Sequence, residues 1–196
     1  KLYFTNEEGS DAVKLRSVSS LLGVPFKDIE DDPLTHWAEY VRILGVEDKI
    51  LIIDKNDLSI QDMEWWLKRE KAGLIMIDQL RKVRGFDDMS GVQRLERVFN
   101  WGREVSKAYA PVITVTQLDG LAENEPYPGM ARLYESKTAV QGEMDAIVNI
   151  GVVDGSVPAN ARYLNVVKNK LPTPEDPALR HGKHEVVLHA DIARFA

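Results

Sequence analysis

Short apolar runs alternate with longer amphipathic stretches along the first two thirds of this 196-residue sequence, and no other feature restricts the fold as strongly. The apolar runs are typical of buried strands, and the stretches between them repeat their apolar residues at helical spacing. A helix between successive strands favours a parallel sheet, because parallel neighbours need a crossover connection. We therefore predict an α/β protein with a mainly parallel sheet flanked by helices.

The boundaries of these elements follow from apolar runs and capping residues. Strands are expected at 2–5, 50–53, 74–77 and 112–116. Helices are expected at 10–22, 34–44, 59–73 and 92–110. Ser10 and Asp11 are candidate caps of the first helix, which Gly23 ends. Ser59 begins the third helix, and an acidic, proline-containing link is expected at 28–33.

The last third of the sequence has a different character. Strands without helices between them are expected at 146–150, 163–167, 185–188 and 192–195. Such strands favour an antiparallel C-terminal edge of the sheet or an antiparallel ribbon. Residues 118–134 hold two prolines and two glycines without periodicity, and a connection of this length is usually functional. We predict that residues 1–196 form a single domain, because a chain of this size can bury its own core.

The composition excludes several classes of site and partner. The absence of cysteine excludes disulfides, thiolate zinc sites, iron–sulfur clusters and cysteine nucleophiles. The 25 basic and 31 acidic residues give a net charge of -6, which argues against a protein that coats nucleic acid through bulk positive charge. No apolar run approaches the about eighteen residues of a membrane span, so no membrane partner is expected and the cytosol is favoured.

Three expected strands are followed by polar residues that can act on a phosphate or on water, namely Glu7, Asp78 and Gln117. Ligands of open parallel sheets bind at the carboxyl ends of the strands, so these side chains are expected to converge on one crevice. Asp78 would hold Mg²⁺ directly or through water, and Glu7 would orient or deprotonate the attacking water. Gln117 would sense the γ-phosphate by hydrogen bonding. The alternative interpretation is that acids and amides accumulate where strands meet solvent.

Basic residues near these strand ends are candidates for contact with phosphates of DNA or of a nucleotide. Arg81, Lys82 and Arg84 follow Asp78 closely, and phosphate contact and a solvated charged turn are both open interpretations of this run. The same two interpretations apply to Arg132 and Lys137.

An ordered set of segments resembles a known family. The segments are 3–8 (YFTNEE) with Arg16 downstream, 74–80 (LIMIDQL), 111–118 (PVITVTQL), 135–137 (ESK) leading to 145–148 (DAIV), and 166–170 (VVKNK). In order and spacing they resemble the RecA-like core of DnaB-type replicative helicases, most closely those of phage helicases and primase-helicases. The resemblance implies a hexameric ring ATPase that binds ATP and Mg²⁺ between subunits and moves along single-stranded DNA. It also implies a cytoplasmic location in a bacterial or phage-infected cell and a possible primase domain or partner.

The resemblance assigns roles to individual residues. Glu7 is similar to the catalytic glutamate, Asp78 to the Walker B aspartate, and Gln117 to the polar sensor after the fourth core strand. Arg16 is placed with the nucleotide-binding residues. Segments 86–92 and 119–137 are similar in position to the two central DNA-binding loops.

Lys168 and Lys170 lie where the family has a Lys-x-Arg pair that points into the neighbouring subunit's nucleotide. Lysine keeps the charge of the arginine finger but lacks its planar fork. Either Lys170 or another residue such as Arg180 would therefore take this role.

The sequence contains no G-x-x-x-x-G-K-[ST] motif, whose backbone amides would cradle the phosphates. In the family this P-loop precedes the strand with the catalytic glutamate, so we expect it, with its strand, upstream of Lys1. The chain as given is expected to bind ATP poorly and to hydrolyse none.

Two other functions are consistent with the same residues. A RecA-like recombinase or mediator ATPase would bind DNA without unwinding it, and a strand-displacement assay would separate it from a helicase. A non-catalytic scaffold or assembly module would keep the fold without a P-loop, and the residues immediately upstream would reveal it.

Overall fold

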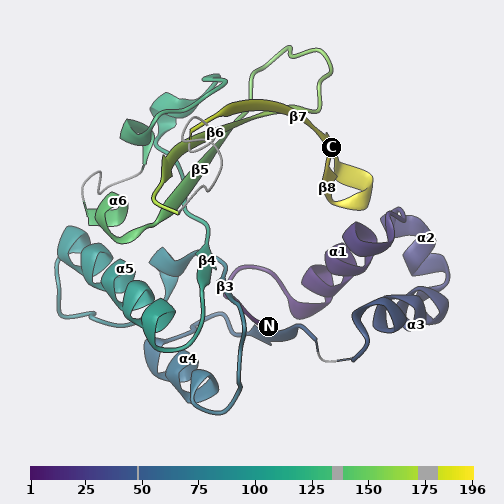
Figure 1. Cartoon of the computed structure of the whole chain (residues 1–196), viewed down its shortest axis with the longest axis horizontal. Coiled ribbons are helices and arrows are strands. Elements are labelled where there is room, and N and C mark those ends of the chain that lie inside the picture. Colours follow the sequence, from purple (N-terminus) through teal and green to yellow (C-terminus); the bar gives the residue numbers. More distant parts are fainter. Residues whose placement is uncertain (48, 134–138, 172–180) are drawn as a thin grey trace. The chain divides into compact units, whose positions relative to one another are not determined.

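The computed structural model describes residues 1–47, 49–133, 139–171 and 181–196 (Figure 1). The chain divides into two compact units. The first consists of Lys1–Val115 with Ala190–Arg194, and the second of Thr116–His189 with Phe195–Ala196. None of the helices in the described ranges is long and apolar enough to cross a membrane.

A four-stranded parallel sheet forms the centre of the first unit. Its strands lie in the order β2 (Leu51–Asp54), β1 (Leu2–Thr5), β3 (Ile75–Ile77) and β4 (Val112–Thr114). Every neighbouring pair is parallel, as the alternation of strands and helices predicts. Phe4 of the central strand is fully buried, and Ile75 and Ile77 beside it are 0% and 1% exposed. The mainly parallel α/β class predicted from the sequence is therefore confirmed.

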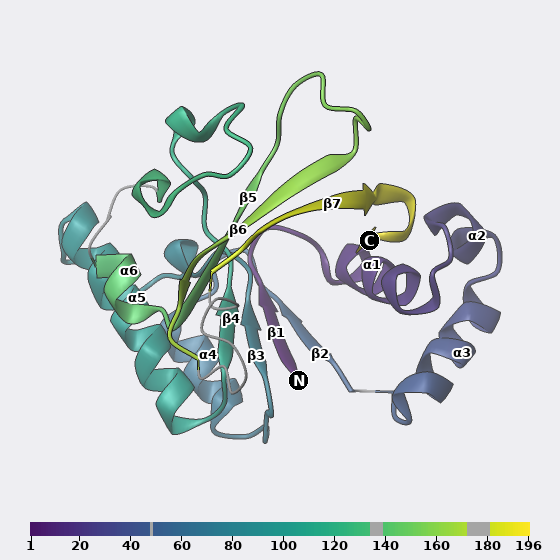
Figure 2. The same ribbon diagram turned by 45° about the horizontal axis from the view of Figure 1, so that its top comes forward.

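Helices of this unit lie on two sides of the sheet. They are α1 (Ser10–Leu22), α2 (Phe26–Asp31), α3 (Pro33–Leu44), α4 (Ile60–Leu67) and α5 (Gly91–Ala108), with short 3-10 turns η1 (Leu80–Lys82) and η5 (Ala190–Ile192). Figure 2 shows α4 and α5 on the side of β3 and β4, and α1 to α3 on the side of β2. Helices α2 and α3 pack against α1. The crossovers between parallel strands thus follow the predicted pattern.

The prediction of an acidic link at 28–33 is wrong for most of that segment, because residues Phe26–Asp31 form helix α2. One buried side chain, Ile29, packs against Val18 and Tyr40 of the flanking helices. A six-residue helix shows too little of the helical period to be seen in a sequence pattern. Its stability comes from this tertiary contact.

The two predicted helix starts differ in how they are capped. Ser59 caps α4 as expected and forms a reciprocal capping box with Asp62. Neither Ser10 nor Asp11 caps α1, where Gly9 is the N-cap residue. Instead, the backbone N–H of Ser10 donates to Oδ2 of Asp54 at the end of β2, at 2.9 Å. The predicted cap is wrong because the acceptor comes from a segment distant in sequence.

An antiparallel sheet of the second unit has the order β5, β6, β7 and β8, of which β8 begins at Arg194, the last residue of the first unit. The strands are β5 (Ala146–Gly151), β6 (Ala161–Asn169), β7 (Lys183–His189) and the short β8 (Arg194–Phe195). The pairing β5–β6–β7 is antiparallel, as the strands without intervening helices predict. A short helix α6 (Ala139–Glu143) precedes β5 and was not predicted.

The segment predicted as a long connection at 118–134 has local structure up to residue 133. It contains the 3-10 turns η2 (Gly120–Ala122) and η3 (Met130–Arg132), and Leu118 forms an isolated bridge with Leu133. The side chain of Asn149, which is 3% exposed, donates to the carbonyl oxygens of Pro128 at 2.9 Å and Gly129 at 3.1 Å. A buried asparagine of β5 therefore fixes the middle of this segment.

Candidate functional site

The carboxyl ends of β1 and β3 form the topological switch point of the parallel sheet. The chain leaves β1 for β2 on one side, and it leaves β3 for β4 on the other side. In open α/β sheets, ligands bind in the crevice at such a point. A ligand of this sheet is therefore expected beyond Thr5 and Ile77.

Glu7 and Asp78 follow these two neighbouring strands. Phe4 is in register with Ile77, and the backbone N–H of Asp78 donates to the carbonyl oxygen of Phe4 at 2.8 Å. The backbone of Asp78 thus lies beside the end of β1, and Glu7 follows that end by two residues. The structure places both acidic residues that the sequence singled out at the same edge of the sheet.

The Glu7 carboxylate is held at both oxygens. Its Oε1 pairs with the Lys82 ammonium, and its Oε2 accepts a hydrogen bond from Nε2 of Gln79. The ion pair is accessible, since the side chains of Lys82 and Glu7 are 44% and 29% exposed. The sequence analysis did not predict a role for Gln79, and it predicted for Lys82 a contact with phosphates and not with Glu7. The sequence feature that could have indicated this contact is that Gln79 and Lys82 lie within four positions of Asp78.

Buried polar atoms without hydrogen-bond partners gather at the same strand ends. Among the described residues, these atoms are Nδ2 and Oδ1 of Asn6 and Oε1 of Gln79. Leaving such a group unpaired costs about 1–3 kcal/mol, so native proteins rarely do so without a reason. Gln79 also has a φ of 55°, in the left-handed region that side chains disfavour. Orphaned atoms and a strained backbone next to Glu7 and Asp78 are typical of a functional site.

Arg16 on α1 lies near this edge but is paired within the chain. Its Nη1 donates to Oε1 of Glu8 at 2.9 Å, and its Nη2 pairs with the second oxygen of Glu8. Burial raises the pKa of the Tyr3 hydroxyl, the charge of Asp78 raises it further, and Arg16 opposes the shift. Tyr3 therefore stays protonated at neutral pH, and it lies close enough to Asp78 and Arg16 for both charges to act on it.

The basic run after Asp78 is anchored through its backbone. The N–H of Arg84 donates to Leu58 O, and the N–H of Ile60 donates to Arg84 O, both at 2.9 Å. Arg94 on α5 donates to the carbonyl oxygens of Arg81 at 3.2 Å and Val83 at 2.6 Å. The run is therefore a fixed segment from which individual side chains extend.

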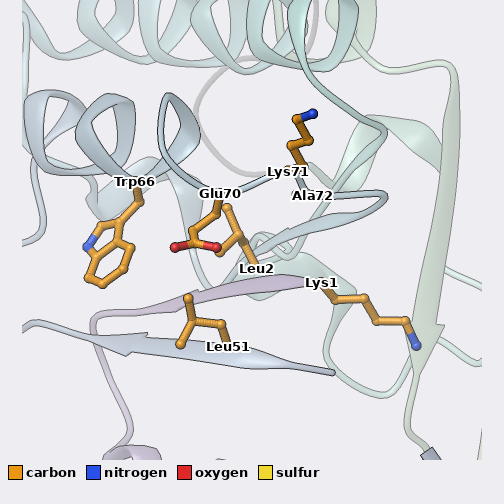
Figure 3. A pocket seen from close by; sticks show the side chains of 7 residues that line it. All are labelled: Lys1, Leu2, Leu51, Trp66, Glu70, Lys71 and Ala72. Carbon is orange, nitrogen blue, oxygen red and sulfur yellow. The ribbon is translucent and has the colours of Figure 1, made fainter. Parts of the chain in front are cut away.

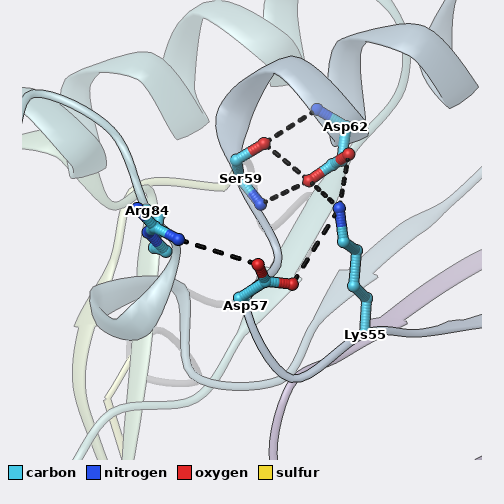
Figure 4. A network of polar contacts seen from close by, with 5 residues as sticks. All are labelled: Lys55, Asp57, Ser59, Asp62 and Arg84. Atoms are coloured by element: carbon cyan, nitrogen blue, oxygen red, sulfur yellow. Dashed lines mark hydrogen bonds and ion pairs between the residues drawn. The ribbon is translucent and has the colours of Figure 1, made fainter.

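The Arg84 side chain lies at the edge of an ion-pair network (Figure 4). Arg84 lies 3.6 Å from Asp57, and Lys55 donates to both oxygens of Asp62 at 2.9 Å. The hydrogen bond from Lys55, with a second from Ser59, lowers the pKa of Asp62 from 3.8 to about 2. These five side chains line part of a polar cavity of about 380 Å³. Their charges compensate one another, and none of their atoms is among the buried orphaned polar atoms.

The predicted first DNA loop, 86–92, forms a turn that leads into α5. The backbone N–H of Met89 donates to Phe86 O at 3.0 Å, and the guanidinium of Arg97 lies 5.1 Å from the centre of the Phe86 ring. Asp87 and Asp88 give the turn itself acidic character. Positive charge near this loop therefore comes from the preceding run and from α5.

The remaining predicted residues belong to the second unit. Gln117 is exposed at its start. Lys168 donates from Nζ to the carbonyl oxygen of Gln141, and the backbone N–H of Lys170 donates to Asp145 O at 2.7 Å while its side chain is exposed. The convergence of Gln117 with Glu7 and Asp78 stays a prediction.

Arg132 in the predicted second DNA loop is engaged by an acid. Its Nε donates to Oε2 of Glu125 at 2.6 Å, and this hydrogen bond raises the pKa of Arg132. Lys137, the segment 135–137 and Arg180 lie outside the described residues.

A second cavity, of about 370 Å³, opens at the opposite end of the parallel sheet (Figure 3). It lies by the first residues of β1 and β2, Leu2 and Leu51, and Trp66 of α4 also lines it. Ligand sites of open α/β sheets lie at the carboxyl ends of the strands, so this position does not favour a catalytic role.

The donors at the strand ends fit Mg²⁺ bound together with a nucleotide better than a protein-made metal cage. Within the described residues, no three His, Asp or Glu side chains form a cluster that could hold a metal ion. The Asp78 side chain is half-buried and forms no hydrogen bond or ion pair with a described residue. A single fixed carboxylate suits Mg²⁺, which keeps several waters and takes phosphate oxygens as further ligands. The orphaned amides of Asn6 and Gln79 are available to polar ligand atoms beside it.

Comparison of the whole chain with solved structures identifies this arrangement. All of the chain superimposes on a DnaB-like replicative helicase, described with its interactions with primase, at a TM-score of 0.77 and 17% identity. The chain has the RecA-like fold of DnaB-type helicase cores. It also superimposes over its full length on the ATPase domain of a second protein, at a TM-score of 0.76 and 18% identity.

The likeness to DnaB-type cores has a defined extent. The chain spans 49% of the DnaB-like helicase and 73% of the ATPase-domain structure. No family model matches the sequence, and no curated protein sequence matches it. The structural neighbours are thus helicase and ATPase domains, and the likeness concerns the fold.

Proposed function

We propose that this chain is the core of an ATP-dependent replicative DNA helicase of the DnaB type. The observation that carries the proposal is the juxtaposition of Glu7 and Asp78 with the orphaned polar atoms of Asn6 and Gln79 at the switch point. ATP would be hydrolysed at subunit interfaces by residues at these strand ends. Hydrolysis would be coupled to movement of the protein along single-stranded DNA. A homohexameric ring and a primase domain or partner are part of the same proposal.

Each residue of the proposed site has a chemical task. Glu7 would accept a hydrogen bond from the attacking water and take its proton, and Asp78 would hold a magnesium ion directly or through water. Bound ATP would supply the electrophilic γ-phosphate, and bound magnesium would offset part of its negative charge. Gln117, Lys168 and Lys170 belong to the second unit, and sensing of the γ-phosphate and contact with a neighbouring subunit's nucleotide are their proposed roles.

The proposal requires a phosphate-binding loop, which the 196 residues do not contain. A Gly-rich loop ending in Lys-Ser or Lys-Thr upstream of Lys1 is therefore part of the proposal, and the experiment first determines whether the gene encodes one and then uses the protein with that segment. That protein is expected to hydrolyse ATP faster when single-stranded DNA is added. Absence of the loop would contradict the ATPase proposal and favour a scaffold function.

A pair of matched variants tests the role of Glu7. Glu7→Gln is expected to lower turnover by about 10²–10⁴-fold, the usual contribution of a general base, while nucleotide binding survives. Glu39→Gln removes the same charge from α3 and is expected to leave turnover unchanged, because Glu39 pairs with Arg42 on that helix. Unchanged turnover in Glu7→Gln would remove the assignment. A strand-displacement assay then separates a helicase from a recombinase that binds DNA without unwinding it.

A further inference from the structure

Lys82 connects the proposed general base with the segment that leads to the first DNA loop. Its ammonium pairs with Oε1 of Glu7, while its backbone belongs to η1, between β3 and the turn at 86–92. Glu7 is thus held by a residue from the region proposed to meet DNA.

The backbone around Lys82 is fixed, so its side chain is the part that can change partner. The N–H of Lys82 donates to Gln79 O at 2.8 Å, and Val83, the next residue, is fully buried. Arg94 binds the carbonyl oxygens on either side, those of Arg81 and Val83. The Lys82 side chain itself is 44% exposed and extends on a flexible stem.

A phosphate of DNA and the Glu7 carboxylate would compete for this ammonium. Both groups are anions, and a phosphate on Lys82 would place a second negative charge beside Glu7. Repulsion between the two anions makes simultaneous binding unfavourable. Gln79 would still hold the other oxygen of Glu7, so the carboxylate would stay in place while Oε1 becomes free.

We propose that Lys82 is a positioning residue that pairs with Glu7 in the absence of DNA and with a phosphate of single-stranded DNA in its presence. Release of Oε1 then lets Glu7 accept the proton of the attacking water, so DNA binding activates the site. This inference rests on the proposed function, and it adds a path by which DNA stimulates hydrolysis.

Binding of a fluorescent oligothymidine to the 196-residue chain tests the competition without any ATPase activity. Anisotropy is measured over a range of salt concentrations for wild type, Glu7→Gln, Lys82→Gln and the double variant. Glu7→Gln is expected to tighten binding about two- to fivefold, the factor that a partly exposed ion pair contributes. Lys82→Gln is expected to weaken binding and to lower the salt slope by about one, as expected for loss of one phosphate contact.

The control variants separate competition from a general charge effect. Glu39→Gln also removes one negative charge and frees the paired Arg42, but these residues lie on α3. This variant is expected to change DNA affinity less than Glu7→Gln does. The tightening by Glu7→Gln is expected to disappear in the double variant, because Lys82 is then absent. Lys82→Arg keeps a cation at the position and is expected to retain DNA binding, which excludes misfolding as the cause of weaker binding in Lys82→Gln.

The outcomes distinguish the inference from the function on which it rests. Equal tightening by Glu7→Gln and Glu39→Gln, or tightening that persists without Lys82, would overturn the competition and leave DNA binding intact. Failure of the wild-type chain to bind single-stranded DNA would contradict the proposed function as well.

Discussion

Gly85 and Ile60 approach each other so closely that a Cβ atom on Gly85 would lie 2.6 Å from Cδ1 of Ile60. Gly85 also has a φ of 149°, which side chains rarely adopt. It lies next to Arg84, whose backbone is bonded to Leu58 and Ile60. The contact therefore fixes the end of the basic run against the start of α4.

Gly85→Ala is expected to destabilise the chain by about 1–3 kcal/mol, because the added methyl group forces both a strained backbone and a displaced Ile60. Urea unfolding measures the change. Gly91→Ala is the matched control, since Gly91 begins α5 with nothing within 4 Å of an added Cβ. Alanine there is expected to be neutral or to stabilise by up to about 1 kcal/mol. Equal effects of the two substitutions would contradict this account of the contact.

Asp62→Asn is expected to show a stability defect that depends on pH. The pKa of Asp62 is about 2 in the folded chain and 3.8 ordinarily, chiefly because Lys55 donates to its carboxylate. A lowered folded pKa stabilises the fold above about pH 4, and this stabilisation is lost as the pH falls toward 2. We expect a difference of about 1 kcal/mol at pH 7, since solvent screens a side chain that is 31% exposed.

Urea unfolding of wild type and Asp62→Asn at pH 7, 4 and 3 measures this difference, which is expected to narrow below pH 4. Asp57→Asn is the control, because its contacts with Lys55 and Arg84 are long, at 3.9 and 3.6 Å. Its effect is expected to stay within about 0.5 kcal/mol. A defect in Asp62→Asn that keeps its full size at pH 3 would argue against the ion pair as its cause.

The fold of the first unit could be predicted because its signals are local. Helix α1 occupies Ser10–Leu22 as expected, since Gly23 adopts the left-handed conformation that ends it. Helix α5, expected at 92–110, ends at Ala108, and Tyr109 beyond it is 43% exposed. The spacing of apolar residues in long amphipathic helices and buried strands can be read from the sequence without knowledge of the elements they pack against.

The features that were missed depend on residues far apart in the sequence. The Asp54 side chain accepts a hydrogen bond from the first turn of α1 across 44 positions, and no local sequence pattern predicts this contact. Glu7 and Asp78 could be selected as polar residues after buried strands. The contacts of Glu7 with Gln79 and Lys82 could not be predicted, because they depend on which strands are neighbours in the sheet.

Asn149→Ala is expected to destabilise the second unit by about 1–3 kcal/mol. The substitution removes a fully buried bond to Pro128 O, which then keeps its bond from Asn165, and a partly buried bond to Gly129 O. Limited proteolysis is expected to cut the segment 118–133 faster as well. Asn165→Ala removes bonds to Tyr127 and Pro128 that are only partly buried, at 3.2 and 3.1 Å, and is expected to have the smaller effect. The reverse order would show that burial does not determine the cost.

Thr114→Val is expected to loosen the segment that begins with Asp78. The Thr114 hydroxyl donates to Ile77 O at 2.9 Å and accepts from the Leu80 N–H at 3.2 Å, so it joins β4 to both sides of Asp78. Valine keeps the shape and removes both bonds, with an expected cost of about 1 kcal/mol and faster hydrogen exchange at the Leu80 amide. Thr116→Val is the control, because no hydrogen bond of its hydroxyl to a described residue is present. Unchanged exchange at Leu80 in Thr114→Val would show that the strand end is held by other contacts, and Asp78 would then be positioned by β1 and β3 alone.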